Sequence, residues 1–426
     1  MRDVAITLII FGLLPVILSR PYVGILVWSW LGYMNPHRLA WGFSTTMPFA
    51  MMVALATFAA MIASKERHPL PWSRETVVLL VLVLWMFMTT VFSLYPWLAW
   101  PQWDKVWRIM LMTYVTLMLI NDPQRLRLLV YVIALSLGFY GFKGGAFVLT
   151  GGSANSVLGP TGSFIEDRNS LGLAMIMTVP LLYFMRSQMV HAWVRAALLL
   201  GIVLTLIAIV GTHSRGALLG LAAMMLFFLL KSRQKFAAIL AMIPLALVLL
   251  YVMPEEWFQR METIEHWEED ESASERVRAW HNAIDLAQQR FIGGGMRALV
   301  LWGGRDSHSI YFGMLGEHGW VGLGLFLLLL GLTWRSASWI IRHAKREPEL
   351  RWARDLAAMI QVSLIGYMVA GAFLGLQYFD MYYHLVVIVV MTKILVRRAL
   401  EPEPEAPARP PALGRRTSVA ARGGDG

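Results

Sequence analysis

Residues 194–231 read VRAALLLGIVLTLIAIVGTHSRGALLGLAAMMLFFLLK, two apolar runs at about 194–212 and 215–231 separated by a short polar turn. A hydrocarbon core about 30 Å thick is crossed by roughly 20 apolar residues in a helix, so each run is long enough to span a membrane. This stretch therefore predicts two membrane-spanning helices joined by a tight turn.

The same pattern recurs along most of the chain. Further spans are predicted at about 46–64, 75–94, 105–121, 126–148, 169–186, 235–253, 310–333, 355–376 and 379–397. The 426 residues are 57% hydrophobic and only 15% charged, whereas soluble domains carry roughly 25% charged residues. We therefore expect an all-α, polytopic integral membrane protein with about twelve transmembrane helices.

The first 35 residues leave two interpretations open. Two short apolar runs, at about 4–19 and 22–34, are either two tight spans or one broken element. No cleavable signal peptide is evident, because no small-residue cleavage site follows the first run. Because the number of spans in these residues is undecided, the sequence does not predict on which side of the membrane the N-terminus lies.

The charges predict the orientation. The net charge is +10. The basic residues fall mostly in short loops, as the positive-inside rule predicts for cytoplasmic loops. Because they are distributed in this way, the positive charge argues against nucleic-acid binding. The basic loops contain Lys65, Arg67 and Arg74, then Arg125 and Arg127, then Lys231, Arg233 and Lys235, then 335–354, then the tail from Lys393. The loops expected to face outward are 95–104, 149–168, 212–215, 254–309 and the turn near 377, and the C-terminus is expected in the cytoplasm.

The 254–309 loop and the C-terminal residues 401–426 differ in composition from the predicted spans. Residues 1–400 are expected to form one transmembrane domain whose 254–309 loop carries surface helices, and in this loop Val277, Trp280, Ile284 and Ala287 recur at helical spacing. Residues 401–426 are rich in Pro, Gly, Arg and Glu and predict a disordered tail.

Polar residues at the outward loops are the candidates for chemistry. Arg215 lies in the turn between two spans, where an arginine is costly unless it is paired or faces water. Arg276 and Trp280 share one helix face, and the planar fork of an arginine suits a phosphate. Arg278 either contacts substrate or, like Arg276, pairs with the acidic run 268–271.

Two further groups each have a structural alternative. His308 precedes a Gly-rich helix; an imidazole there can accept a proton at neutral pH, although a His at a helix start is also typical of a cap. Arg168 and Asn169 either bind a phosphate or sugar or belong to an N-cap built around Asp167. The absence of Cys excludes a thiolate metal site, a bare acidic run such as 268–271 is typical of a solvated loop, and no metal or other cofactor is expected.

Together these residues resemble the O-antigen ligase superfamily, bacterial inner-membrane glycosyltransferases that also include O-antigen polymerases and protein O-glycosylation ligases. The resemblance rests on Asp167-x-Asn169, Ser214-Arg215-Gly216, Arg276-x-x-x-Trp280 and His308-Ser309, the last followed by Gly319-x-x-Gly322. It covers about residues 167–325. The chain departs from the family pattern at Gly293-Gly294-Gly295, which lacks the expected Pro. The opening, residues 1–38, is similar to O-glycosylation ligases found beside exosortase systems.

The resemblance implies a reaction and its partners. A glycan linked to undecaprenyl diphosphate would be moved to lipid A–core at the periplasmic face of the inner membrane, with inversion and without a metal. His308 would be the general base, and Arg215 and Arg276 would stabilise the diphosphate. A polymerase or a protein ligase would use the same donor with another acceptor, and a non-catalytic lipid-glycan transporter is an alternative of another class. The short 254–309 loop mildly favours a ligase.

Overall fold

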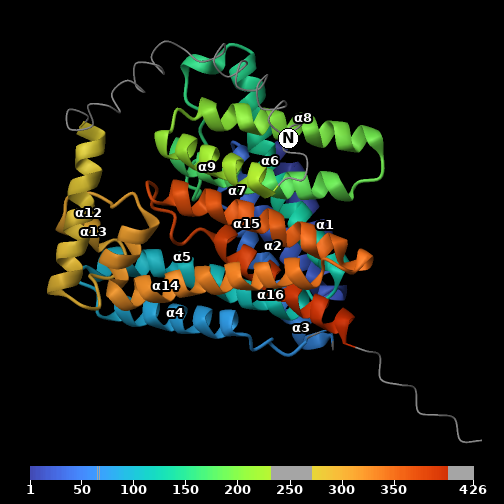
Figure 1. Cartoon of the computed structure of the whole chain (residues 1–426), viewed down its shortest axis with the longest axis horizontal. Coiled ribbons are helices and arrows are strands. Elements are labelled where there is room, and N and C mark those ends of the chain that lie inside the picture. The colour runs from blue at the N-terminus through green and yellow to red at the C-terminus, as the bar shows by residue number, and fades with distance from the viewer. Residues whose placement is uncertain (65, 67, 232–270, 402–426) are drawn as a thin grey trace, which may run out of the picture.

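The fold is a bundle of apolar helices. The computed structural model describes residues 1–64, 66, 68–231 and 271–401, and this part contains helices but no β-strand (Figure 1). The predicted span 235–253, the 254–270 segment with the first three residues of the acidic run 268–271, and the tail 402–426 lie outside the described residues. The α-helices are α1 (Arg2–Ser19), α2 (Pro21–Met34), α3 (Phe49–Ala63), α4 (Arg74–Val91), α5 (Pro96–Leu119), α6 (Pro123–Leu149), α7 (Arg168–Gln188), α8 (Ala192–Gly211), α9 (Arg215–Lys231), α12 (Glu271–Gln289), α13 (Ala298–Trp302), α14 (Ile310–His343), α15 (Arg351–Gly371) and α16 (Asp380–Leu400). Short 3₁₀ helices are η1 (Pro36–Leu39), η2 (Phe43–Thr45), η3 (Gly152–Ala154) and η4 (Pro348–Leu350).

Seven of the described helices are long and apolar enough to cross a membrane: α1, α4, α6, α7, α8, α14 and the segment Pro348–Gly371 that contains α15. The helices α2, α3 and α9 are shorter, at 14, 15 and 17 residues, and α5 and α16 are not among the seven. The predicted class, an all-α polytopic membrane protein, is confirmed.

The N-terminal runs form two helices rather than one broken element. Arg20 separates α1 from α2. The Asp3 carboxylate, at the start of α1, accepts hydrogen bonds from the backbone N–H of Gly42 at 3.0 Å and the hydroxyl of Ser44 at 2.8 Å. Because Ser44 follows α2, the two helices form a hairpin that returns the chain to the end of the bundle where it began.

Several predicted boundaries were wrong. Residues 96–104 were expected in an outward loop but form the first turns of α5, since Pro96 at the helix start needs no N–H partner. α14 continues to His343, ten residues beyond the predicted end, so Arg335 and Arg342 lie on a helix. α15 ends at Gly371, which leaves 372–379 as a loop.

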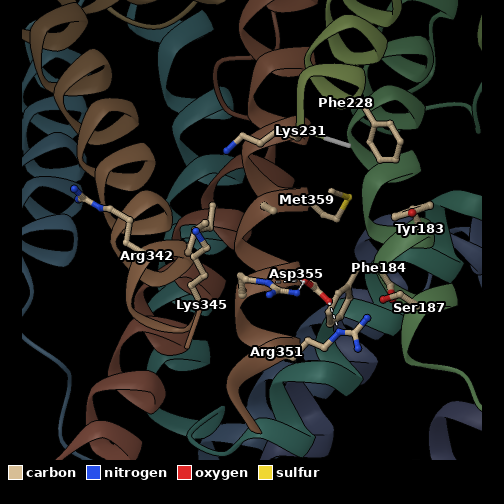
Figure 2. Close-up of a pocket in the computed structure, with 13 residues that line it drawn as sticks. Tyr183, Phe184, Ser187, Phe228, Lys231, Arg342, Lys345, Arg351, Asp355 and Met359 are labelled. Carbon is tan, nitrogen blue, oxygen red and sulfur yellow. Dashed lines mark hydrogen bonds and ion pairs between the residues drawn. The ribbon is translucent and has the colours of Figure 1, made fainter. Parts of the chain in front are cut away.

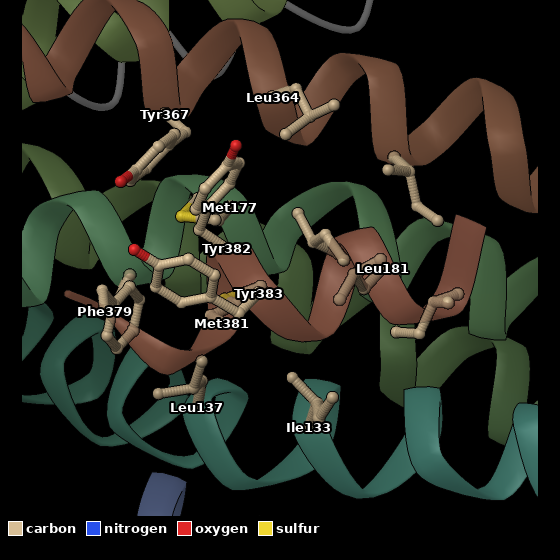
Figure 3. Packing of buried hydrophobic residues seen from close by; sticks show 14 of the residues in the cluster. Ile133, Leu137, Met177, Leu181, Leu364, Tyr367, Phe379, Met381, Tyr382 and Tyr383 are labelled. Carbon is tan, nitrogen blue, oxygen red and sulfur yellow. The ribbon is translucent and has the colours of Figure 1, made fainter. Parts of the chain in front are cut away.

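The core lies where α6, α7, α15 and α16 meet (Figure 3). Tyr367 of α15 and Tyr382 of α16 stack with ring centroids 5.0 Å apart, beside Met177 of α7 and Leu137 of α6. Small residues allow the backbones to approach closely: a side chain at Gly145 of α6 would collide with the carbonyl of Leu204 in α8.

The alternation of helices gives the bundle two ends. We call one the His308 end; it contains residues 35–48, 92–95, 150–167, 212–214, 290–309 and 372–379. The other, the Lys231 end, contains residues 20, 66, 68–73, 120–122, 189–191, 344–350 and 401. Helix α12 runs crosswise to α14 beside the His308 end (Figure 1), and its buried Ala279, Ala283 and Leu286 confirm the predicted amphipathic helix.

Candidate active site at the His308 end

The start of α7 is fixed by a side-chain cap and packs against the 212–217 turn. The Asp167 carboxylate accepts from the backbone N–H groups of Asn169 at 2.9 Å and Ser170 at 3.1 Å, which satisfies two of the unpaired donors of the helix. One turn later, a Cβ on Gly172 would lie 2.8 Å from that of Ala217. The cap that the sequence suggested is therefore present, and it holds half-buried Arg168 and Asn169 near the Arg215 turn.

Phe373 connects the Arg215 turn to helix α12. A Cβ on Gly216 would lie 3.0 Å from the Cβ of Phe373, so glycine is needed for this approach. The Phe373 ring lies 6.0 Å from the ring of Trp280, which stacks on Phe312 of α14 at 5.0 Å. The Arg215 turn and the Trp280 face of α12 therefore lie on either side of one aromatic cluster.

The same cluster positions the loop that carries His308. The Trp280 indole N–H donates to the carbonyl of Ser307 at 3.1 Å, and the hydroxyl of Ser307 donates to the carbonyl of Ser309 at 3.2 Å. His308 lies between these two buried serines, is itself exposed, and has a φ of 46°. Such a left-handed backbone is strained for a residue with a side chain, and strain of this kind gathers at functional sites.

Arg276 lies one turn before Trp280 on the same face of α12 and is half-buried. Arg278 is exposed and borders a separate small cavity with Glu275, His281 and Arg305. Arg305 forms an ion pair with Glu275 across that cavity. The Arg215 turn, the Trp280 face of α12 and the His308 loop therefore border one aromatic cluster, while Arg278 borders a separate cavity.

The glycine run 293–295 pairs with a break in α14. Gly319 has φ 67° and ψ −169°, which interrupts the helix, and a Cβ there would lie 1.9 Å from the carbonyl oxygen of Phe291. The backbone N–H of Gly294 donates to Gly316 at 2.9 Å and that of Gly295 to Glu317 at 2.8 Å. These bonds satisfy carbonyls that the break would otherwise leave unpaired inside the bundle. The glycine run therefore fixes the chain after α12 without the proline that the family pattern has.

A buried polar network, which the sequence reasoning missed, surrounds this break. Glu317 accepts hydrogen bonds from the backbone N–H of Arg297 at 2.8 Å and from the hydroxyl of Tyr378. The His318 ring lies 2.6 Å from both the Tyr378 and the Thr89 hydroxyls. Burial and the neighbouring Glu317 raise the pKa of Tyr378 well above its ordinary value, so this hydroxyl keeps its proton. An ionisable Glu-His pair inside a Gly-rich apolar span was the available signal, because such groups are expensive there.

The network borders a cavity of about 650 Å³ at the His308 end. Its wall includes Arg297, Asp306, Glu317, Gln377 and Asp380 from the C-terminal part, and Asn35, Arg38, Gln102, Lys105 and Asp167 from the N-terminal part. None of the predicted site residues lines it, although Asp306 precedes His308 by two positions and Asp167 caps the helix of Arg168. Among the described residues, no group of three His, Asp or Glu side chains is arranged to hold a metal ion.

Comparison with protein families gives two adjoining matches. Residues 200–327 match the family model described as O-antigen ligase. This segment is an O-antigen ligase domain. It contains Arg215, Arg276, Arg278 and His308, and it includes the Gly319 break of α14. The match supports a relation of this segment to the O-antigen ligase superfamily and suggests an enzyme of glycan transfer.

Residues 1–190 match a family of unknown function (DUF5935). Arg168, Asn169 and the N-terminal wall of the large cavity belong to this second segment rather than to the ligase domain. No curated protein matches the chain. The resemblance of the C-terminal motifs to the O-antigen ligase superfamily is thus confirmed for residues 200–327.

Proposed function

We propose that this protein is a ligase that moves a glycan from undecaprenyl diphosphate to lipid A–core at the periplasmic face of the bacterial inner membrane. The observation that carries the proposal is the convergence, within the ligase domain, of the Arg215 turn, the Arg276–Trp280 face and the His308 loop on the cluster of Trp280, Phe312 and Phe373.

The proposed reaction is a single displacement. His308 takes the proton from the acceptor hydroxyl as its oxygen attacks the anomeric carbon. A new glycosidic bond forms with inversion, the bond to the diphosphate oxygen breaks, and the charge remains on the undecaprenyl diphosphate. Arg215 and Arg276 stabilise that developing charge, and their contribution is strengthened where water is excluded. Arg168, Asn169 and Arg278 are proposed to contact substrate further from the reacting bond.

The topology proposed with this function places the His308 end in the periplasm and the Lys231 end in the cytoplasm. The Lys231 end carries the basic loops that the positive-inside rule assigns to the cytoplasm. Residue 401 lies at that end, so the C-terminus is proposed to be cytoplasmic. By the same helix alternation Met1 lies at the His308 end, so the N-terminus is proposed to be periplasmic.

Reconstitution with purified undecaprenyl-diphosphate glycan tests the proposal. The protein in liposomes is offered lipid A–core, a protein acceptor or a second glycan, and the product is identified by mass. Glycosylated lipid A–core is the expected product. If glycan is transferred only to protein or to a second glycan, the proposed acceptor is wrong. If no acceptor leads to release of undecaprenyl diphosphate, the proposed transferase activity is contradicted.

A further inference from the structure

The large cavity at the His308 end lies between the two matched segments of the chain. One side is built from α2, the 35–38 segment, α5 and the 162–170 loop, all within residues 1–190. The other side is built from Arg297, Asp306, Glu317 and the 375–380 segment. Its volume of about 650 Å³ falls within the range of small-molecule sites. A ligand there would therefore contact both segments at once.

The cavity lining is rich in polar groups but balanced in charge. Three cations, Arg38, Lys105 and Arg297, face four carboxylates, Asp167, Asp306, Glu317 and Asp380. A polyanion would be repelled by the carboxylates, while a long apolar chain would leave these groups unpaired. A sugar hydroxyl can both donate and accept, so an uncharged, hydroxyl-rich ligand matches this mixture. The neighbouring side chains of Trp28, Phe164 and Phe379 offer flat apolar faces for sugar rings.

One wall residue has a vacant acceptor. Gln377 is only 3% exposed. Its amide N–H donates to Glu317 at 3.4 Å, whereas its Oε1 has no hydrogen-bond partner. An unpaired buried acceptor is unfavourable, so a small shift of the Gln377 amide that lets Oε1 accept from a ligand hydroxyl would satisfy it.

The wall is also rigid. Arg297 has a φ of 60° and is held by the bond from its N–H to Glu317. Tyr378 is held by Glu317 and His318. A site whose polar groups are fixed before binding loses less entropy when the ligand arrives.

We propose that this cavity binds an uncharged segment of the glycan, and that residues 1–190 supply one wall and so help to set which glycan is accepted. This inference rests on the proposed function, because it takes glycan transfer as the reaction. The acceptor and donor glycans share the required chemistry, and the experiment separates them.

Binding is measured by calorimetry on the full-length His308→Ala protein, which prevents turnover. The probes are the oligosaccharide released by mild acid from the undecaprenyl-diphosphate donor and the core oligosaccharide of the acceptor. Gln377→Met tests the C-terminal wall, and Gln102→Met, at a half-buried position on α5, tests the N-terminal wall. Gln289→Met is the matched control, because Gln289 is exposed at the same end but does not line the cavity.

One oligosaccharide should bind, and each wall variant should weaken it about tenfold, as expected for the loss of one hydrogen bond to a buried partner. The control should change affinity less than twofold. Whichever probe binds identifies the donor or the acceptor glycan as the occupant. Binding of neither probe, or equal binding by wild type and both wall variants, would overturn the proposal. If the protein binds the oligosaccharide but transfers no glycan in liposomes, the proposed ligase function is contradicted and the proposed sugar site is supported.

Discussion

The two ends of the bundle carry cavities of similar volume and opposite character. The cavity at the Lys231 end, about 690 Å³, lies between α7, α9, α14 and α15, and its lining has five cations and one carboxylate (Figure 2). Those cations are Lys231, Arg342, Lys345, Arg351 and Arg354. The cavity at the His308 end balances three cations with four carboxylates. A surplus of positive charge is typical of a cytoplasmic end, whereas the His308-end cavity combines both signs of charge and buries two of its carboxylates, Glu317 and Asp380.

The ends also differ in how their charges are held. At the Lys231 end the Lys231 ammonium lies 2.7 Å from the amide oxygen of Gln361, and Arg354 donates to half-buried Asp355 at 2.8 Å. Such partly exposed contacts contribute little to stability. At the His308 end Glu317 is 3% exposed and bonded to Arg297 and Tyr378. The difference indicates that substitutions at the His308 end should affect activity and stability far more.

The largest expected effect is on His308. His308→Ala should lower transfer in liposomes by a factor of about 10² to 10⁴, the usual contribution of a general base, while the amount of folded protein is unchanged because the side chain is exposed. His281→Ala is the matched control, since His281 is also exposed at this end and its ring bonds to the carbonyl of Val277 on its own helix. Near-normal transfer by His308→Ala would exclude the general-base role.

The next effect concerns the helix break. Gly319→Ala should lower the thermal stability strongly, because φ is 67° and the new Cβ would collide with Phe291; the strained backbone alone costs about 1–3 kcal/mol. Gly324→Ala on the same helix, where a Cβ meets nothing within 4 Å, should unfold at the wild-type temperature or slightly above. Equal melting temperatures for the two variants would show that the break is not needed.

Arg215→Lys should lose most of the transfer activity, by about tenfold or more, because a point charge cannot reproduce the bidentate fork on a phosphate. Arg305→Lys, at the same end, should keep its activity within about twofold, since its exposed ion pair with Glu275 contributes little. Full activity in Arg215→Lys would assign this arginine a structural role.

The smallest effect should come from the Lys231 end. The double variant Arg342→Gln with Lys345→Gln should leave the kcat and the glycan affinity within about twofold of wild type, because exposed charges contribute little individually. Replacing the two buried carboxylates that line the other cavity, with Glu317→Gln and Asp380→Asn, should weaken glycan binding more strongly, because these groups are only 3% and 6% exposed. If the two double variants had equal effects, the proposed functional difference between the two ends would be contradicted.

Much of this arrangement follows from local sequence. The apolar runs predicted most helices, the spacing of Trp280 and its neighbours predicted α12, and short motifs identified the ligase domain. The predicted start of α5 was wrong because hydropathy does not show that a proline can begin a helix. The predicted end of α14 was wrong because the helix continues as an amphipathic segment, which hydropathy does not distinguish from a loop. The N-terminal hairpin could not be predicted, since it depends on the contact between Asp3 and Ser44.

The cavity and its polar network could not be predicted for a similar reason. Glu317 meets Tyr378 across 61 residues of sequence, and His318 meets Thr89 across 229. The pairing of Gly294 with Gly316 depends on a backbone break that only the packed helices reveal. Local sequence patterns indicated which residues are unusual, but not which of them line the same cavity.

The central claim is that the two ends face opposite compartments, with the reaction at the outward one. The chain has no cysteine, so single cysteines report directly on exposure. Arg305→Cys at the His308 end and Arg346→Cys at the Lys231 end are both at exposed positions. In cells with a permeabilised outer membrane, a maleimide that cannot cross the inner membrane should label Arg305→Cys at once, and Arg346→Cys only after lysis. Labelling of Arg346→Cys in intact cells, with Arg305→Cys protected until lysis, would contradict the account.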